Sequence, residues 1–283
     1  YVPAERNFLS SITNINKVSD LIIGSLKNYS IEFRNAQLAH RNKAIDLPIN
    51  NTKIVYEPKE DENYLLFNNK RLKLSDASSG FHSIVPLYWV TKYLIEYVKQ
   101  GEKKLLELLS TDQTIRRNNE LKELNTQKLD EKTLRAREKK INEKYVSKYF
   151  VNIVEEPEQN LFPSSQMQLL NSLLAFNNGN NILIMTTHSP YLINYLTLAI
   201  KAEMVKSKLN NEEAKKKISN IVSLESTLKA DNLVIYELNE TDGSIQKLPD
   251  YKGLPSDDNF LNNSIEDTNE LFLQLQEIEK GWR

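Results

Sequence analysis

The sequence predicts an α/β protein, because short apolar runs with the composition of strands alternate with longer segments that have a helical pattern. Two of the runs, residues 149–154 (YFVNIV) and 181–188 (NILIMTTH), are dominated by apolar and β-branched residues and predict buried strands. In addition, apolar and polar residues alternate over residues 52–80, a pattern typical of two or three antiparallel strands.

Helices are predicted for most of the N-terminal part. Residues 7–28 and 29–44 predict two consecutive helices, after a strand at residues 1–6 (YVPAER) that runs into a loop. Residues 81–98 predict a further helix, with Pro86 in its first turns, where a missing amide hydrogen is tolerated.

The C-terminal part continues the alternation of strands and helices. Helices are expected at about residues 164–176 and 190–209, one after each apolar strand. Residues 232–248 predict a β-hairpin, with Thr-Asp-Gly supplying the turn. Residues 231–283 carry 12 acidic against 4 basic residues and are expected to end in a helix.

Residues 99–148 form a charged stretch without proline. The stretch holds 14 Lys and Arg against 9 Asp and Glu, a net charge of +5. This composition predicts a solvent-exposed helical pair or short coiled-coil arm. The chain therefore divides into residues 1–98, the inserted arm at 99–148, and residues 149–283.

The whole-chain composition limits the class of protein. The length of 283 residues allows one large or two medium domains, and the formal net charge of −1 gives no global signature of nucleic-acid binding. The chain has no cysteine, which excludes disulfides and thiolate metal sites and fits a cytoplasmic location. No apolar run approaches the length of a membrane span, so no membrane partner is expected. The first residue, Tyr1, is not Met, and we expect the chain to be part of a longer product.

The first motif with chemical content is Ser78-Ser79-Gly80, at the start of the helix predicted for residues 81–98. Two hydroxyls, a glycine that permits close backbone approach and the unpaired amides of a helix N-terminus form an end that binds anions. The alternative is an ordinary helix cap, since Ser and Gly are common at that position.

The second motif is Glu155-Glu156-Pro157-Glu158, directly after the first apolar strand. A carboxylate at the carboxyl end of a strand in an open α/β sheet lies where ligands usually bind. In nucleotide hydrolases one such carboxylate holds Mg²⁺ and the next orients the attacking water. Two adjacent glutamates are explained if Glu155 faces a metal and Glu156 faces water.

The third motif is Thr-Thr-His-Ser-Pro at residues 186–190, at the end of the second apolar strand. It places the imidazole of His188 at a strand end, and Pro190 begins the next helix. The alternative is a histidine that only caps this helix. Because only three histidines occur and this one follows a second strand end, the functional interpretation is favoured.

These three motifs, in this order, resemble the C-terminal half of ABC-type ATPase domains. Within them the chain is most similar to the bacterial AAA-annotated group related to the OLD-family, RecF and SMC ATPases; YVPAER and the closing hairpin also resemble that group. The resemblance covers nearly the whole chain apart from the charged arm. It implies a P-loop ATPase core with a mostly parallel sheet flanked by helices, an antiparallel part and an inserted helical or coiled-coil arm.

The resemblance also implies roles for single residues. Glu155 matches the Walker B acid near Mg²⁺, Glu156 the catalytic base, and His188 the switch histidine that senses the γ-phosphate of ATP. The signature motif, which contacts ATP held by the partner of a head-to-tail dimer, is matched by Ser78, Ser79 and Gly80. Residues 157–160 occupy the place of the loop that crosses the dimer.

The chain departs from the family pattern in three ways. His82 stands where relatives usually have glutamine, and about 75 residues separate Gly80 from Glu155. None of the seven glycines is followed by lysine, so the Walker A motif Gly-x-x-x-x-Gly-Lys-Ser/Thr is missing from the sequence. Family architecture places this motif upstream of Tyr1, and we expect the chain alone to bind ATP poorly.

The function implied is hydrolysis of ATP, with Mg²⁺, by a dimeric machine. ATP would bring two subunits together, and hydrolysis would control an associated effector, with a nuclease in bacterial phage defence or DNA repair as the candidate. The alternative is a non-catalytic module derived from such an ATPase, whose basic arm binds nucleic acid or a partner helix.

Two further alternatives are less favoured. A nuclease domain within the chain would need an Asp-x-Asp after a strand, whereas Asp257 and Asp258 follow Pro255 in a polar loop. A metal hydrolase built from the three glutamates at 155, 156 and 158 with His188 lacks the paired histidines of zinc sites.

Overall fold

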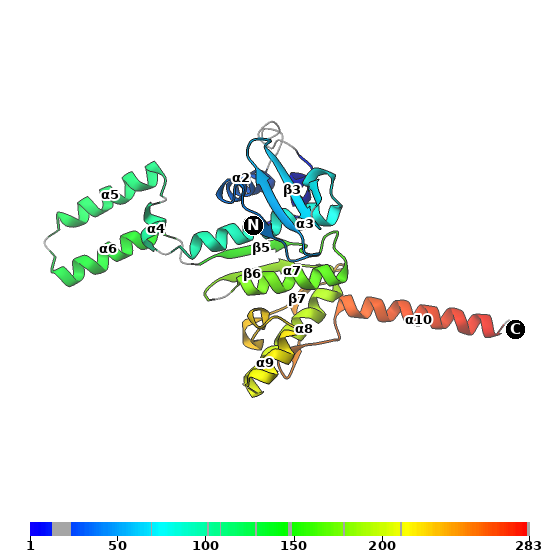
Figure 1. The fold of residues 1–283 in the computed structure, drawn as a ribbon. Helices are drawn as coiled ribbons and strands as arrows, with labels where there is room; N and C mark the ends of the chain where they lie inside the picture. The colour runs from blue at the N-terminus through cyan, green and yellow to red at the C-terminus, as the bar shows by residue number, and fades with distance from the viewer. Residues whose placement is uncertain are drawn as a thin grey trace. The chain divides into compact units, whose positions relative to one another are not determined.

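The computed structural model describes residues 1–12, 24–68, 70–100, 102–107, 109–127, 129–146, 149–177, 179–209 and 211–281. The chain forms two units (Figure 1). The first unit consists of Tyr1–Val154 with Phe176–Ile184, and the second of Glu155–Ala175 with Met185–Arg283. Each unit is described by itself.

An antiparallel sheet of four strands forms part of the first unit. The strands, in sheet order, are β1 (Ile45–Asp46), β2 (Lys53–Glu57), β3 (Glu62–Phe67) and β4 (Lys70–Lys73). The central register pairs Val55 with Tyr64, and the β2–β3 turn contains Asp61 with a φ of 52°. The antiparallel strands predicted for residues 52–80 are confirmed, and β1 is an additional edge strand.

Two helices of the first unit are α2 (Gly24–Ala39) and α3 (Ser79–Val98). The helix predicted for 81–98 is confirmed. The division predicted between residues 28 and 29 is wrong, because α2 runs through it and ends at Ala39 rather than at residue 44. After α2 the chain turns through Asn42, whose φ is 59°, and enters β1. The part of the first predicted helix at residues 13–23 lies outside the described residues.

The strand predicted for residues 1–6 is also wrong for most of its length. Val2 forms a single parallel bridge to Val154, and Ala4–Ser10 forms a 3₁₀ helix, η1. Pro3 precedes this helix in an extended conformation, with φ −72° and ψ 157°, and its carbonyl accepts a hydrogen bond from the amide of Arg6. The chain therefore leaves strand geometry directly after one bridge.

Pro86 lies in the interior of α3 rather than in its first turns, because the helix begins at Ser79. Proline has no amide hydrogen, so the carbonyl of His82, four residues earlier, loses its helical donor. The hydroxyl of Ser10 donates to this carbonyl at 2.9 Å. In the next position, the guanidinium of Arg6 donates from Nε to the carbonyl of Ser83 at 3.1 Å. These two hydrogen bonds attach η1 to α3, one of them through the carbonyl that Pro86 leaves without a helical donor.

The core of the first unit is built on α3. Trp89 is fully buried, and its ring meets that of Phe33 from α2 edge to face, with centroids 6.0 Å apart. Its indole nitrogen donates to Nδ1 of His40 at 3.0 Å, while Nε2 of His40 lies 2.8 Å from a carboxylate oxygen of Glu96. His40 is therefore a buried histidine that links elements of the core.

The charged stretch 99–148 is helical where it is described. It contains α4 (Glu102–Glu107), α5 (Thr111–Asn125) and α6 (Glu131–Tyr145), of which α5 and α6 pack side by side (Figure 1). Glu120 of α5 accepts hydrogen bonds from Lys144 and Tyr145 of α6, and these bonds lower the pKa of its carboxyl group. Polar contacts thus hold α5 and α6 together, and the buried apolar residues of the two helices are Leu124 and Ile141.

Strands β5 (Val151–Glu155) and β6 (Ile182–Thr186) pair with each other. Residue 150 bonds to 182 and residue 156 to 186, so the pairing is parallel. The two strands are not buried as predicted, because one face is open: the exposed fractions are 39% for Val151, 36% for Ile153, 49% for Ile182 and 47% for Ile184. The apolar composition matches a strand covered on both faces, whereas the described residues cover one.

The second unit is mainly helical. Its helices are α7 (Pro163–Phe176, whose last residue belongs to the first unit), α8 (Pro190–Leu209), α9 (Glu212–Ser219) and the C-terminal α10 (Phe260–Gly281). Two small hairpins lie between α9 and α10, formed by β7 (Tyr236–Leu238) with β8 (Ile245–Lys247) and by β9 (Asp250–Tyr251) with β10 (Leu254–Pro255). Short 3₁₀ turns are η2 (Leu74–Asp76) in the first unit, and η3 (Leu224–Ser226) and η4 (Ala230–Asn232) in the second.

These elements confirm the mixed α/β class, and they correct the expected sheet. In the part of the chain that the structure describes, the parallel pairing is limited to β5, β6 and the bridge at Val2, and the other strands are antiparallel. The helix predicted for 190–209 matches α8, while α9 and the β9–β10 hairpin were missed. Among the described residues, none of the helices combines the length and apolarity needed to cross a bilayer.

Arg6 provides the first test of this fold. Its side chain is buried and donates to the carbonyls of Ser83 and Pro3. In Arg6→Met these buried acceptors lose a charged donor, so we expect the free energy of unfolding to fall by about 2–3 kcal/mol. The measurement is guanidinium unfolding, with Arg116→Met on the exposed arm as the control, expected within about 0.5 kcal/mol of the parent. Equal effects of the two substitutions would contradict the role given to Arg6.

Candidate functional site

The two adjacent glutamates lie at the carboxyl end of β5. Glu155 is the last residue of the strand, and the amide of Glu156 still donates to the carbonyl of Thr186 at 3.0 Å. The φ of Glu156 is 42°, in the left-handed region that residues other than glycine rarely adopt. Such conformations concentrate at functional sites, because the surrounding structure has to hold them. The chain therefore turns at Glu156, the residue that the family resemblance matches to a catalytic base.

His188 lies two residues beyond the end of β6, within the second unit that also holds Glu156. Its Nε2 is 4.0 Å from Oε1 of Glu156. The exposed fractions are 84% for the imidazole and 39% for the glutamate side chain. Because water screens this contact, its contribution to stability is small, and both groups are accessible to a substrate at this edge.

Glu158 connects the two loops that follow the strands. Its Oε1 accepts a hydrogen bond from the hydroxyl of Thr187 at 2.8 Å and another from the backbone amide of His188 at 2.7 Å. A carboxylate that accepts two donors forms charge-assisted hydrogen bonds, which are stronger than neutral ones. Glu158 thereby fixes the backbone of His188 relative to the turn that contains Glu156.

A second connection between the two loops involves Ser189, the residue after His188. The hydroxyl of Ser189 donates to Oε1 of Gln166 at 2.6 Å, and Nε2 of Gln166 donates to the carbonyl of Leu161 at 3.0 Å. Ser189 and Gln166 are 6% and 7% exposed. Gln166 belongs to the first turn of α7, so this helix holds the loop after β5 and the loop after β6 together.

The turn at residues 156–161 is closed by its own backbone. The amide of Gln159 donates to the carbonyl of Glu156, and that of Leu161 to the carbonyl of Glu158, while Asn160 has a φ of 61°. Within the described residues, Oε2 of Glu158 and Oε1 of Gln159 are buried acceptors without a donor. Unsatisfied buried acceptors cost free energy, so this turn favours an additional donor.

The signature residues belong to the first unit and begin α3. Ser78 is the N-cap, with φ −69° and ψ 157°, and its hydroxyl makes no capping hydrogen bond. Ser78 and Ser79 are exposed, and Gly80 is partly exposed. The helix start thus lacks the side-chain capping bond of an ordinary cap. His82 holds this end in place, since its Nε2 lies 2.8 Å from the carbonyl of Leu74.

A divalent metal at the carboxyl end of β5 would rely on few protein ligands. Among the described residues, no group of three or more Asp, Glu or His side chains is arranged to hold a metal ion. Mg²⁺ commonly binds through one or two carboxylates, several waters and the phosphates of a substrate. The partly exposed Glu155 at the strand end fits that mode. Glu158 is turned toward Thr187 and His188 instead, which argues against the four-residue metal hydrolase.

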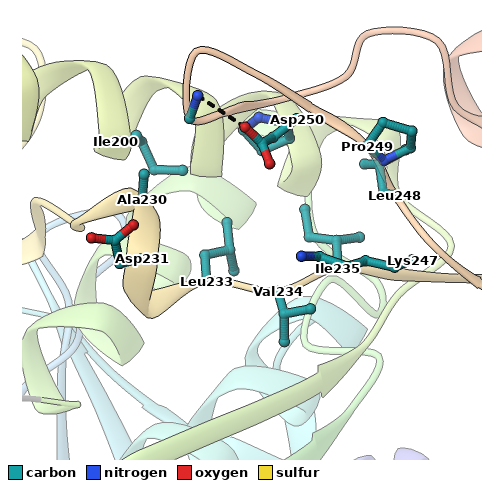
Figure 2. Close-up of a pocket in the computed structure, with 12 residues that line it drawn as sticks. Ile200, Ala230, Asp231, Leu233, Val234, Ile235, Lys247, Leu248, Pro249 and Asp250 are labelled. Carbon is teal, nitrogen blue, oxygen red and sulfur yellow. Dashed lines mark hydrogen bonds between the residues drawn. The ribbon is translucent and has the colours of Figure 1, made fainter.

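A separate small pocket lies in the second unit between α8, η4 and the two hairpins (Figure 2). Leu233, Ile235 and Leu248 are among the side chains that line it, and Asp250 accepts a hydrogen bond from the amide of Gly253 at its edge. Its volume of about 100 Å³ is below the ~300 Å³ typical of small-molecule sites. The pocket is a packing gap behind the hairpins and shares no residue with the strand-end site.

Comparison with protein families, with curated proteins and with solved structures finds no significant match to this chain.

Sequence patterns missed the residues that support the site. Glu158 was placed in the loop and in the metal-hydrolase alternative, but not as a support of the second loop, although a carboxylate three residues after the strand-end Glu155 is a candidate to bond a neighbouring loop. Gln166 and Ser189 had no recognisable signal, because their pairing depends on how α7 lies against the loop after β6. The left-handed conformation of Glu156 was equally invisible.

Removing the carboxylate of Glu158 tests the connection between the loops. Glu158→Ala leaves the hydroxyl of Thr187 and the amide of His188 without their acceptor. We expect amide hydrogen exchange in the peptide covering 186–190 to become about 10–100-fold faster, because local opening no longer breaks these bonds. Glu158→Gln keeps one acceptor oxygen and should change exchange by less than about fivefold.

The control for this measurement is Glu240→Ala, at an exposed position of the β7–β8 turn. It should leave exchange in the 186–190 peptide unchanged. Unchanged exchange in Glu158→Ala as well would show that the loop is held by other contacts.

Proposed function

We propose that this chain is the ATP-hydrolysing part of an ABC/SMC-type dimeric ATPase of the group related to OLD-family ATPases. The observation that carries the proposal is the position of Glu156 and His188 just beyond the ends of two paired parallel strands. Oε1 of Glu156 lies 4.0 Å from Nε2 of His188, and the backbone of Glu156 is in the left-handed conformation. Ligands of open α/β folds bind at the carboxyl ends of parallel strands. The order of the three sequence motifs supports the same conclusion.

In the proposed reaction, water attacks the γ-phosphorus of ATP and the bond to the bridging oxygen of ADP breaks. Glu156 orients this water and accepts its proton, a role that suits a carboxylate 39% exposed at the strand end. His188, held through its backbone by Glu158, contacts the γ-phosphate. Mg²⁺ bound near Glu155 would neutralise phosphate charge.

The signature helix would act on the nucleotide of a second copy. Ser78 and Ser79 are exposed at the N-terminus of α3, where the first amides of a helix have no acceptor within the helix, an arrangement that binds phosphate through backbone N–H groups and the helix dipole. In this proposal ATP joins two subunits head to tail, and hydrolysis separates them. The cytoplasmic location and the effector, with a nuclease in defence or repair as candidate, remain part of the proposal.

The open face of β5 and β6 offers a surface on which a segment that carries the P-loop could pack. Val151, Ile153, Ile182 and Ile184 all belong to the first unit, and each is exposed by more than a third. A contiguous apolar sheet face is normally covered by another layer. We propose that a P-loop-bearing segment or partner packs on this face.

The glutamate that follows β5 gives the decisive test. In the assembly that carries the P-loop, Glu156→Gln removes the proton acceptor while keeping the shape of the side chain. We expect steady-state ATP hydrolysis to fall by about 10²–10⁴-fold, with nucleotide binding retained. Glu57→Gln is the matched control, since Glu57 also ends a strand. Hydrolysis unchanged in Glu156→Gln would refute the proposed role.

A second candidate function rests on the basic arm, which would bind nucleic acid whether or not ATP is hydrolysed. Lys132, Lys139 and Lys140 of α6 are exposed, and the arm carries a net charge of +5. Replacing these three lysines with Gln should weaken binding to duplex DNA and reduce the salt slope by about 0.9 for each lost phosphate contact.

The control for the arm changes the same charge elsewhere in the first unit, with Lys43, Lys59 and Lys70 replaced by Gln. Fluorescence anisotropy over a salt series measures both sets. If the parent protein binds no DNA at low salt, or if both sets have the same effect, the arm is not a nucleic-acid site.

A further inference from the structure

The C-terminal helix α10 exposes an apolar stripe. None of its described side chains is buried, and Leu271, Leu275 and Ile278 are 59%, 65% and 59% exposed. Their spacing of four and three residues places them on one face of the helix, and Ile265 and Phe272 lie beside that face. A helix with such a stripe gains most of its stability from packing, so this face calls for a partner.

An apolar groove lies between α8 and α9 in the second unit. Leu198, Ala202, Val205 and Leu209 line it from α8 at intervals of four, three and four residues, and Ile218 and Ile221 line the opposite side. Its volume is about 520 Å³. Leu198, Leu209 and Ile221 are 43%, 52% and 63% exposed, so the groove is open in the described chain.

The charges of the two surfaces are complementary. Residues 190–219, which form α8 and α9, carry six lysines against three glutamates, a net of +3. The segment Phe260–Gly281 carries five acidic residues against one lysine, a net of −4. Lys201 lines the groove, is exposed and has no ion-pair partner among the described residues. Acidic side chains such as Glu270 and Glu277 flank the apolar stripe of α10.

We propose that α10 docks into the α8–α9 groove of a second copy of this chain. At 1.5 Å per residue the stripe from Leu271 to Ile278 extends about 12 Å, and the side of the groove from Leu198 to Leu209 about 18 Å, so the groove is long enough to hold the whole stripe. Both surfaces occur on one chain, and both are exposed in it.

When two copies exchange α10 reciprocally, the stripe and the groove of each chain are both covered. The exchange closes a two-fold dimer. The start of α10 is fixed for this exchange. The amide of Phe260 donates to Glu237 at 2.8 Å, and the buried Asn259 caps the amide of Asn262. The contact uses no nucleotide and is independent of the ATPase proposal.

Charge reversal and sedimentation test the complementarity. The full protein should sediment as a dimer without nucleotide. Lys201→Glu alone, or Glu270→Lys with Glu277→Lys, should raise the dissociation constant by about tenfold or more, because like charges then face each other. Combining the three substitutions on one chain should restore most of the affinity. A monomer at all concentrations, or reversals without effect, would overturn the proposal.

Cysteine cross-linking identifies the contact, because the chain has no native cysteine. Ala202→Cys lies in the groove and Leu275→Cys on the stripe. Mixing the two single variants under mild oxidation should give a disulfide-linked heterodimer, whereas either variant alone should stay largely uncross-linked. The matched control pairs Ala202→Cys with Glu240→Cys, on the exposed hairpin turn.

The doubly substituted chain separates the two possible occupants of the groove. A covalent dimer, without larger cross-linked species, supports reciprocal exchange between two copies. A disulfide that forms within one chain, visible as a monomer with altered gel mobility, would show that α10 folds onto its own groove and would overturn the proposal.

Discussion

The candidate site depends on one carboxylate that joins two loops. Each loop follows a strand of the β5–β6 pair, and Glu158 accepts donors from Thr187 and His188 while its own backbone closes the turn that begins at Glu156. Without this connection the two strand ends would still be adjacent, because the sheet places them so, but the histidine would be free to turn away. The left-handed φ of 42° at Glu156 is retained only if the surroundings fix the turn. The hydrogen bonds of Glu158 therefore fix the same turn that holds the backbone of Glu156, the proposed base, in its left-handed conformation.

A comparable constraint organises the first unit. Pro86 removes a donor from α3, and the freed carbonyl of His82 binds the hydroxyl of Ser10, while Arg6 binds the carbonyl of Ser83. Both bonds attach η1 to the first half of α3, the half that begins with the signature serines. This helix start needs such support, because it lacks a side-chain cap of its own. The segment YVPAER thus has a structural explanation that does not depend on any ligand.

Elements with a strong local pattern could be predicted from the sequence. Features that depend on contacts between residues distant in the chain could not. Periodicity located α3, α7 and α8 closely, because each has a long apolar pattern and a clear start at Ser or Pro. It failed at residues 1–6 and at the end of α2, where a proline and a left-handed Asn42 end the regular structure. The strand-end residues of the site followed from strand prediction alone. Their supports did not, since the bond between Gln166 and Ser189 exists only after α7 has packed beside the second loop.

Two of the apolar surfaces left open in the described residues, the β5–β6 face and the α8–α9 groove, differ in what can cover them. The β5–β6 face is built of β-branched side chains on a sheet, with Glu155 as the charged residue at the end of β5, so its natural cover is a packed layer of the same domain. The α8–α9 groove is lined at helical intervals by α8, holds Lys201 and Lys217 beside Glu213, and belongs to a segment with a net charge of +3, which matches a single acidic helix. These surfaces belong to different units of the chain. In the two proposals, the cover of the β5–β6 face and the docking of α10 use different residues, so either contact can be disturbed by substitution without altering the residues that serve the other.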